Sequence, residues 1–295
     1  METGLITKTL SNQYSVKTDS DEYICKPRGL LRKEGYKLLC GDTVKFEITN
    51  PSSKEGYIYS INDRKNSLIR PPVSNIDIAV IVFSLNSPKW DELLVDLLIL
   101  ACLTNGIEPV LCINKSDMAS QTDIEDVYRQ YSKSGCRIIS TDAKHDVGLD
   151  SFKNILSKKI TVFAGQSGAG KSTLINTLTK TNVMETGELS EKIQRGRNTT
   201  RHCELLQYDS GYIVDTPGFS KFDPYLLQPD SIKGMYNEFK QYNGMCRFSD
   251  CKHINEKDCA VIRAIEKEEI PIERHNRYKI IYNMSKEALK IRRGY

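Results

Sequence analysis

A glycine-rich octapeptide leaves few folds open to this chain of 295 residues. It reads GQSGAGKS, that is Gly165, Gln166, Ser167, Gly168, Ala169, Gly170, Lys171 and Ser172, and Thr173 follows it. The octapeptide fits the phosphate-binding pattern G-x-x-x-x-G-K-[ST], and it stands between an apolar strand pattern (ITVFA) and a helical pattern (STLINTL). Glycines let successive backbone N–H groups turn inward and hold phosphates at a helix N-terminus. We therefore expect an α/β domain that binds a nucleotide, with Lys171 at the β- and γ-phosphates and Ser172 on Mg²⁺.

The composition excludes several other classes of protein. Hydrophobic residues make up 39% and charged residues 27%, which is typical of a packed core. We find no apolar stretch of the roughly 20 residues that cross a bilayer, and the N-terminus has no signal-peptide pattern. Nine cysteines, an odd number, do not suggest a disulfide framework. We expect a cytoplasmic protein without a membrane partner. Six scattered cysteines are expected to be small buried side chains: Cys25, Cys40, Cys102, Cys112, Cys136 and Cys203.

The sequence predicts a multidomain protein whose first domain, residues 1–70, is a β-barrel. Five strand patterns occur here, separated by turn residues: GLITKTL, QYSVKT, EYICKPRG, DTVKFEIT and EGYIYSIN. Five short strands without a helical period favour a closed barrel of the OB type. Pro71-Pro72 then forms a stiff linker and a domain boundary.

The second predicted domain, residues 71–223, alternates strands with helices. Strands are expected at 78–83, 109–113, 136–139 and 160–163, with helices at 90–104 (amphipathic), 123–134 and 149–156. Apolar strands that alternate with helices indicate a doubly wound parallel sheet. In the third domain, residues 224–295, short helical patterns surround a Cys/His group and lead into a basic helix, so a mostly α, zinc-binding domain is expected.

Two further motifs specify the nucleotide. Asn114-Lys115-Ser116-Asp117 follows the strand PVLCI and resembles the guanine-specificity motif N-K-x-D of the GTPase superfamily. The Asp117 carboxylate would accept two hydrogen bonds from guanine, which adenine cannot offer, while Asn114 holds neighbouring atoms and the Lys115 stem lies across the base. Asp215-Thr-Pro-Gly218 matches D-x-x-G, in which Asp215 holds Mg²⁺ through water and the Gly218 N–H senses the γ-phosphate.

The order of these motifs is permuted. GTPases ordinarily place the phosphate-binding loop first, then D-x-x-G, then N-K-x-D, whereas here N-K-x-D comes first. Open α/β domains tolerate such a rearrangement because chain termini often lie close together. One consequence is that the segment after Asp215 leads directly into the C-terminal domain, so GTP hydrolysis could move that domain.

Two loops are expected to complete the nucleotide site. Residues 194–202 (QRGRNTTRH) should supply a threonine that closes over Mg²⁺ and the γ-phosphate, with Thr200 preferred and Thr199 as the alternative. Ser140-Thr141 is a candidate for the remaining loop that contacts the base.

A Cys/His group in the third domain has the composition of a metal site. Cys246, Cys251, His253 and Cys259 lie within 14 residues and form the Cys₃His set of tetrahedral structural zinc. A catalytic cysteine and chance clustering are the alternatives. The other histidines (His145, His202 and His275) are expected at the surface or in loops.

The C-terminal segment is basic. A basic segment suits a polyanionic partner, although a solvated helix face is the simpler interpretation of charge alone. Against one acid, Glu287, the segment from residue 274 to 295 carries seven cations: Arg274, Arg277, Lys279, Lys286, Lys290, Arg292 and Arg293.

An OB-like barrel, permuted GTPase motifs and a C-x4-C-x-H-x5-C group, in that order, resemble the ribosome small subunit-dependent GTPase A family. The resemblance spans essentially the whole chain, including RPPVSNID. It implies binding to the small (30S) ribosomal subunit and its rRNA through the barrel and the zinc domain, and a role in late subunit maturation. It also implies GTP hydrolysis to GDP and phosphate that is slow alone, is stimulated by the subunit and promotes release.

The resemblance also bears on the catalytic groups. Phe219 follows Gly218 where many GTPases have a glutamine that orients water, and the family likewise lacks this glutamine. Many members have a histidine before the paired threonines, where this chain has Asn198. Asn198 can hydrogen-bond to water but cannot act as a base near neutral pH. His202, backbone groups or rRNA are the other groups that could complete the site.

Three functional hypotheses follow. The leading one is a monomeric ribosome-assembly GTPase that binds GTP and GDP, takes Mg²⁺ with GTP and holds one structural Zn²⁺. The second is an RNA-binding factor that nucleotide switches on and off with negligible turnover. The third, a GTPase for a protein or membrane partner, is disfavoured because an OB-type barrel and a basic helix suit nucleic acid.

Overall fold

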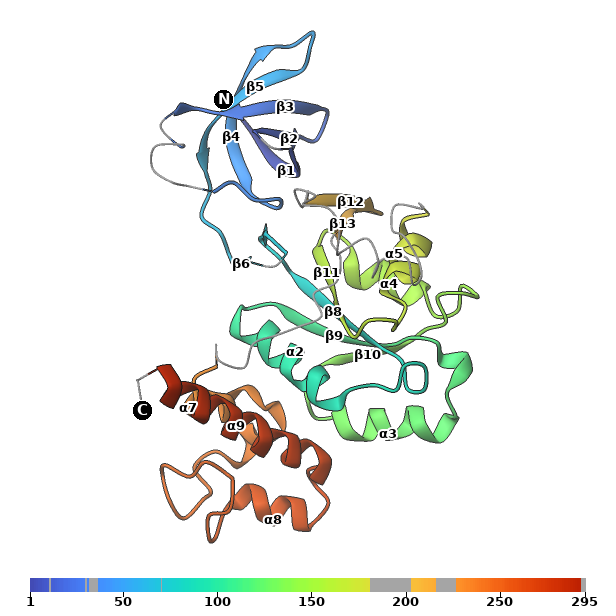
Figure 1. The fold of residues 1–295 in the computed structure, drawn as a ribbon, viewed down its shortest axis with the longest axis vertical. Helices are drawn as coiled ribbons and strands as arrows, with labels where there is room; N and C mark the ends of the chain where they lie inside the picture. The colour runs from blue at the N-terminus through green and yellow to red at the C-terminus, as the bar shows by residue number, and fades with distance from the viewer. Residues whose placement is uncertain are drawn as a thin grey trace.

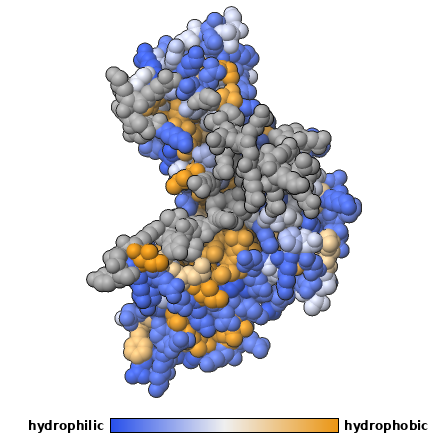
Figure 2. All heavy atoms as spheres, in the orientation of Figure 1, coloured by the Kyte–Doolittle hydropathy of each residue, from blue (hydrophilic) through white to orange (hydrophobic). Residues whose placement is uncertain are grey.

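The computed structural model describes residues 1–10, 12–29, 31, 37–69, 71–180, 203–215 and 227–292. Figure 1 shows three parts arranged along the long axis, with the barrel at the top, the central sheet in the middle and the C-terminal helices at the bottom. The face seen in Figure 2 is mainly hydrophilic, and its hydrophobic residues form separate areas. Within the described ranges, the structure has no helix with the length and apolar character needed to cross a membrane.

The predicted N-terminal barrel of five strands is confirmed. Its strands are β1 (Glu2–Leu10), β2 (Gln13–Lys17), β3 (Glu22–Pro27), β4 (Thr43–Asn50) and β5 (Glu55–Ile61). They pair in the order β1-β2-β3-β5-β4, and β4 returns to β1 to close the barrel. In β4 the side chains of Val44 and Phe46 are fully buried while Lys45 between them is exposed, because alternate residues of a strand point to opposite faces.

The central domain is a doubly wound sheet, as predicted. The parallel strands β8 (Ile78–Phe83), β9 (Glu108–Ile113), β10 (Arg137–Ser140), β11 (Ile160–Gly165) and β13 (Gly211–Asp215) are joined by β12 (Glu204–Tyr208), which is antiparallel to β13. The strand order is β10-β9-β8-β11-β13-β12. One face is covered by α2 (Glu92–Thr104) and α3 (Gln121–Tyr131), the other by α4 (Asp150–Leu156) and α5 (Lys171–Thr179). Strand β12 was not predicted.

The barrel and the central sheet are joined edge to edge. Lys8 of β1 is the Cα partner of Glu204 in β12, and their side chains form an ion pair of 2.8 Å. The Cys203 carbonyl accepts hydrogen bonds from the Thr9 amide (3.2 Å) and the Cys40 thiol (2.7 Å). A short hairpin, β6 (Ser67–Leu68) and β7 (Val73–Ser74), connects the two units. The barrel therefore contacts β12, the strand that pairs with β13, whose last residue is Asp215.

The C-terminal part is mostly helical, as predicted. It contains α7 (Pro229–Met235), η3 (Asn237–Tyr242), α8 (Ala260–Glu266) and α9 (Ile272–Arg292). Its core includes Tyr236, Phe239 and Tyr278, whose rings pack at centroid distances of 5.0 to 5.1 Å. Leu97 and Leu100 of α2 belong to the same core, so this part packs directly on the central domain.

Helix α2 is not the amphipathic helix that the sequence predicted. Every residue from Val95 to Cys102 is buried. One side of α2 packs on the sheet through residues such as Leu98, and the other packs on the C-terminal helices through Leu97. Figure 1 shows α2 lying between β9 and α9. A helix covered on two sides loses the polar face of a surface helix.

The basic character of α9 is also different from the prediction. Arg274 and Arg277 are buried, not presented to a partner or to solvent. Arg277 Nε contacts Asp96 Oδ2 of α2 at 2.7 Å, and Arg274 contacts both Asp96 Oδ1 and, at 2.8 Å, Glu238. Two of the seven predicted cations therefore fix the C-terminal helices to α2. Lys286 and Lys290 are exposed on the same helix.

We expect Asp96→Ala to destabilise the protein by about 3 kcal/mol or more, because it leaves two buried guanidinium groups without their shared carboxylate. Urea unfolding followed by circular dichroism would measure this loss. The matched control is Asp21→Ala, which breaks a surface ion pair with Lys54 in the barrel and should cost much less. Equal costs for the two variants would contradict a structural role for the buried pairs.

Candidate functional site

The predicted nucleotide motifs meet at one edge of the central sheet. Strands β9, β10, β11 and β13 run parallel, so their carboxyl ends lie on the same side. The N-K-x-D motif follows β9, Thr141 follows β10, the phosphate-binding loop follows β11, and Asp215 ends β13. Loops at the carboxyl edge of an open parallel sheet form the usual ligand site of this architecture.

Glycines shape the phosphate-binding loop between β11 and α5. Gly165, Gly168 and Gly170 have φ angles of 129°, 78° and 93°, which favour glycine. A Cβ on Gly165 would lie 2.0 Å from the Val82 carbonyl oxygen, so no side chain fits there. The loop is completed by Gln166, Ser167 and Ala169, and α5 begins with Lys171, Ser172 and Thr173.

Lys171 lies across this loop. Its Nζ donates to the carbonyl oxygens of Gly165 (2.9 Å) and Gln166 (2.7 Å). Burial lowers the pKa of the Lys171 ammonium to about 8. A polyphosphate would offer this ammonium a charged partner and so favour its protonated form.

Asn114 joins three loops of the site. Its side chain is buried, and its Nδ2 donates to the Ala169 carbonyl at 2.9 Å. Its Oδ1 accepts from Thr141 Oγ1 and the Ala143 amide, both at 3.2 Å. A Cβ on Gly170 would lie 2.3 Å from Asn114 Nδ2, which again requires glycine. Asn114 thus fixes the N-K-x-D loop to the phosphate-binding loop.

Lys115 and Asp117, the two charged residues of N-K-x-D, lie in the turn after β9 at the same edge of the sheet. Lys115 has a left-handed backbone (φ 57°), and its Nζ donates to the Gly168 carbonyl at 2.9 Å and the Ser87 carbonyl at 2.7 Å. Asp117 lies exposed in the turn η1 (Ser116–Met118). The contact with Ser87 was not predicted, because a backbone carbonyl leaves no signal in the sequence.

The loop after β10 braces the site in a way the sequence only partly indicated. Thr141, predicted to contact the base, is buried and hydrogen-bonds to Asn114. Asp142 and His145 lie next to Asp117, and His145 Nδ1 is 2.5 Å from Asp142 Oδ2. Burial raises the pKa of Asp142, but its hydrogen bonds with His145 and the Lys144 amide bring it below the usual range.

Asp215, the first residue of D-x-x-G, is half-buried at the end of β13. Its cross-strand partner is Glu204. Burial and the Glu204 carboxylate raise the pKa of Asp215, while the Lys8 ammonium opposes them. Asn198, Thr199, Thr200, His202, Gly218 and Phe219 lie outside the described residues.

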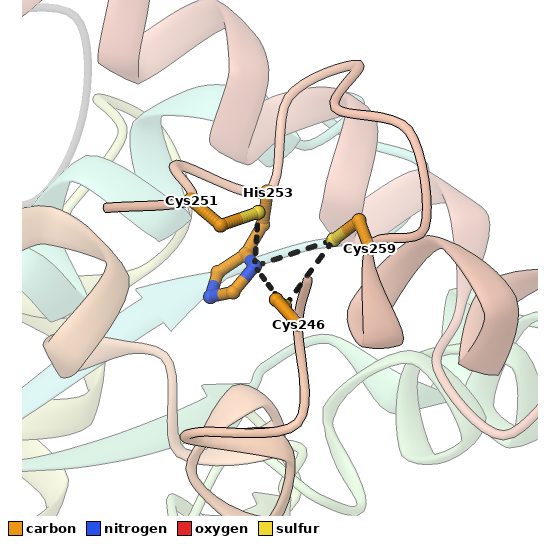
Figure 3. A group of neighbouring side chains, drawn as sticks. All are labelled: Cys246, Cys251, His253 and Cys259. Atoms are coloured by element: carbon orange, nitrogen blue, oxygen red, sulfur yellow. Dashed lines mark hydrogen bonds between the residues drawn. The ribbon is translucent and has the colours of Figure 1, made fainter. Parts of the chain in front are cut away.

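The Cys₃His group forms one compact cluster (Figure 3). His253 Nδ1 lies 3.6, 3.5 and 3.3 Å from the Sγ atoms of Cys246, Cys251 and Cys259. Cys246 Sγ lies 3.9 Å from Cys259 Sγ. A tetrahedron with metal–sulfur and metal–nitrogen bonds of about 2.3 and 2.0 Å has edges of roughly 3.5 to 3.8 Å. These four side chains therefore suit a four-coordinate metal ion.

His275 supports the cluster from α9, contrary to the expectation of a surface position. It is buried, and its Nε2 lies 2.7 Å from the His253 carbonyl oxygen. The expectation was wrong because α9 packs over the metal loop, where Phe239 also contacts the His253 ring at 5.7 Å. His145 is in a loop, as expected. Of the six scattered cysteines, five are buried and Cys136 is half-buried.

Comparisons with known proteins agree with this geometry. The family model described as RsgA GTPase matches residues 61–225, and that of the RsgA N-terminal domain matches residues 3–58. A relative from Clostridium acetobutylicum, named small ribosomal subunit biogenesis GTPase RsgA, is 39% identical over 292 residues, covering 99% of each chain. A protein of the same name from Caldanaerobacter subterraneus is 40% identical over 290 residues, covering 98% of this chain and 97% of the relative.

Two solved structures are similar over nearly the whole chain. One is YjeQ from Thermotoga maritima, with a TM-score of 0.80 and 31% identity, covering 96% of this chain and 98% of the other. The second is YloQ, described as a circularly permuted GTPase, with a TM-score of 0.81 and 31% identity, covering 97% of this chain and 96% of the other.

Proposed function

Because this chain belongs to the RsgA GTPase family, we propose that it binds the small ribosomal subunit and assists its late maturation. The chain is a small ribosomal subunit biogenesis GTPase. In the proposed cycle the subunit stimulates hydrolysis of GTP to GDP and phosphate, and hydrolysis promotes release. One observation carries most of the weight: Asn114 hydrogen-bonds to both the phosphate-binding loop and the loop after β10, so three loops distant in sequence meet at one site.

The site residues have distinct proposed roles. Backbone N–H groups from Gly165 to Thr173 hold the phosphates, and Lys171 neutralises charge that develops on the transferred phosphoryl group. Asp117 reads the guanine edge, while Lys115 covers the base. Ser172, Thr200 and, through water, Asp215 would hold Mg²⁺, which supplies charge neutralisation at the phosphates when bound. Gly218 would sense the γ-phosphate, and Asn198 would orient the attacking water.

The Cys₃His cluster is proposed to hold one structural Zn²⁺. Three thiolates and an imidazole are the ligands that tetrahedral zinc prefers. All four positions are taken by protein side chains, so the site leaves no coordination position for a substrate. Its place between η3 and α8 suggests that the metal stabilises the C-terminal fold.

We assign the ribosome-binding surfaces to the barrel (residues 1–70) and the C-terminal domain (224–295), on either side of the GTPase domain (71–223). These two parts lie at opposite ends of the molecule in Figure 1, so a monomer could contact two rRNA elements at once. A ribosomal partner places the protein's action in the cytoplasm. Because Arg274 and Arg277 are buried, α9 would contact rRNA through other cations, among them Lys286 and Lys290.

Co-sedimentation with purified small subunits tests this function. We expect the chain to pellet with subunits in the presence of a non-hydrolysable GTP analogue and to stay in the supernatant with GDP. Raising the salt concentration about fourfold should weaken binding by about tenfold or more, because each phosphate contact releases counterions. The proposal would be contradicted if the affinity for subunits were equal in both nucleotide states, or if it did not change with salt concentration.

Single-turnover GTP cleavage tests the catalytic part. We expect the rate constant to rise by at least tenfold when subunits are added. A rate that stays at the intrinsic value with saturating subunits would favour the alternative of a nucleotide-switched RNA-binding factor with negligible turnover. The background rate is the rate of GTP cleavage by purified subunits to which the protein has not been added.

A further inference from the structure

The loop that follows β8, residues 84–88, contacts both the phosphate-binding loop and the N-K-x-D turn. None of the three GTPase motifs includes it, and its sequence, SLNSP, carries no recognised pattern. Two residues fix the loop to the domain. Leu85 is buried in the core beside the sheet, and the buried Ser84 hydroxyl accepts a hydrogen bond from the Ser87 amide at 3.2 Å. The loop therefore has a defined conformation next to the site.

Its first contact is with the phosphate-binding loop. Pro88 lies beside Gly168, where a Cβ on the glycine would be 3.5 Å from Pro88 Cδ. The Ser87 carbonyl accepts from Lys115 Nζ at 2.7 Å, and the same ammonium donates to the Gly168 carbonyl at 2.9 Å. Lys115 thus spans two loops, and Ser87 provides half of the support for its ammonium.

Its second contact is with the far end of the N-K-x-D motif. The side-chain amide of Asn86 donates to the carbonyl oxygen of Met118, the residue after Asp117. Met118 also closes the turn, since its amide donates to the Lys115 carbonyl at 3.1 Å. The loop after β8 therefore holds the chain on both sides of Asp117, whose own side chain is exposed.

We propose that residues 84–88 form a further positioning element of the guanine site, with Asn86 as the residue that fixes the base-reading turn. This inference rests on the proposed roles of Lys115 and Asp117. Asn86 does not touch the nucleotide in this proposal; it holds the turn in the conformation that presents the Asp117 carboxylate and the Lys115 stem. Preorganisation of this kind lowers the ordering cost of binding, so its loss appears mainly as faster nucleotide release.

The test is the dissociation rate of a fluorescent GDP from three variants of the full chain. Asn86→Ala removes the amide donor and should speed release about fivefold, a factor typical of one lost hydrogen bond. Asn86→Asp has nearly the same shape but puts a carboxylate against the Met118 carbonyl, so it should be at least as fast. Asn86→Gln keeps the donor and should recover part of the loss. Asn154→Ala, an exposed position on α4, is the matched control and should match wild type.

Two further readouts separate positioning from general damage. The thermal midpoint of the nucleotide-free chain should agree between Asn86→Ala and the control, and KM for GTP should rise by a larger factor than kcat falls. Wild-type release rates in all Asn86 variants, or no recovery in Asn86→Gln, would overturn the proposal. Failure of wild type itself to bind GDP would instead overturn the function on which it rests.

Discussion

Replacing Asp117 with asparagine is expected to move nucleotide preference from guanine to xanthine. The carboxylate can accept from both the ring N–H and the exocyclic amine of guanine, whereas an amide presents a donor to one of them. Xanthine has a carbonyl in place of that amine and so complements the amide. A site built around specific hydrogen bonds rejects a mismatched partner by about 10⁴-fold in favourable cases. We expect GDP affinity to fall by about 10³-fold and xanthosine diphosphate to bind in its place.

Isothermal titration calorimetry with the two diphosphates on wild type and variant would measure the inversion. The matched control is Asp146→Asn, an exposed residue in the neighbouring loop whose left-handed backbone (φ 58°) also accepts asparagine. The control should keep the wild-type preference for GDP. Wild type that binds ATP as tightly as GTP, or a variant that keeps its GDP affinity, would refute the placement of Asp117 at the base.

Continuous motifs made the nucleotide site predictable. The phosphate-binding loop requires a strand before it and a helix after it, and β11 and α5 occupy these positions. Because the carboxyl ends of parallel strands lie at one edge of a sheet, Asn114 after β9 and Asp215 at the end of β13 were expected at the same edge as this loop, despite the permuted order. The contacts that hold these motifs in position could not be predicted from the sequence. Asn86 contacts a backbone carbonyl 32 residues away, and such a contact has no residue pattern.

Tertiary contacts explain the misjudged helices. The apolar run of α2 contains a buried carboxylate, Asp96. Its partners, Arg274 and Arg277, lie about 180 residues away in the sequence, so the sequence around α2 does not indicate them. In the same way, the residues of α9 considered alone have the composition of a basic surface helix. Strand β12 escaped prediction because backbone pairing with β13 on one side and the barrel's β1 on the other stabilises it, and such pairing has no residue pattern. Its burial alternates only weakly.

Loss of the proposed Zn²⁺ should unfold most of the C-terminal part. The loop that carries the four ligands contains few core side chains, and the ligands themselves supply two of its buried contacts, Cys251 and Cys259. In zinc-finger peptides the metal supplies about 10–16 kcal/mol of apparent folding free energy, which is comparable to the whole stability of a typical domain. Thiols also gain protons when the metal leaves, and the burial of Cys251, which raises its pKa to about 12, disfavours a free thiolate there.

Cys251→Ser is therefore expected to abolish stoichiometric zinc, measured by mass spectrometry of the purified chain, and to increase hydrogen exchange throughout α8 and the first half of α9. A strong chelator at elevated temperature should do the same to wild type, and added Zn²⁺ should restore protection. Cys136→Ser, a half-buried cysteine outside the cluster, is the control and should retain one zinc per chain.

Because His275 and Phe239 pack against His253, loss of the metal should propagate into α9 and loosen the Arg274 and Arg277 contacts with α2. A metal-free wild type with a fully protected α9 would show that side-chain packing alone maintains this domain.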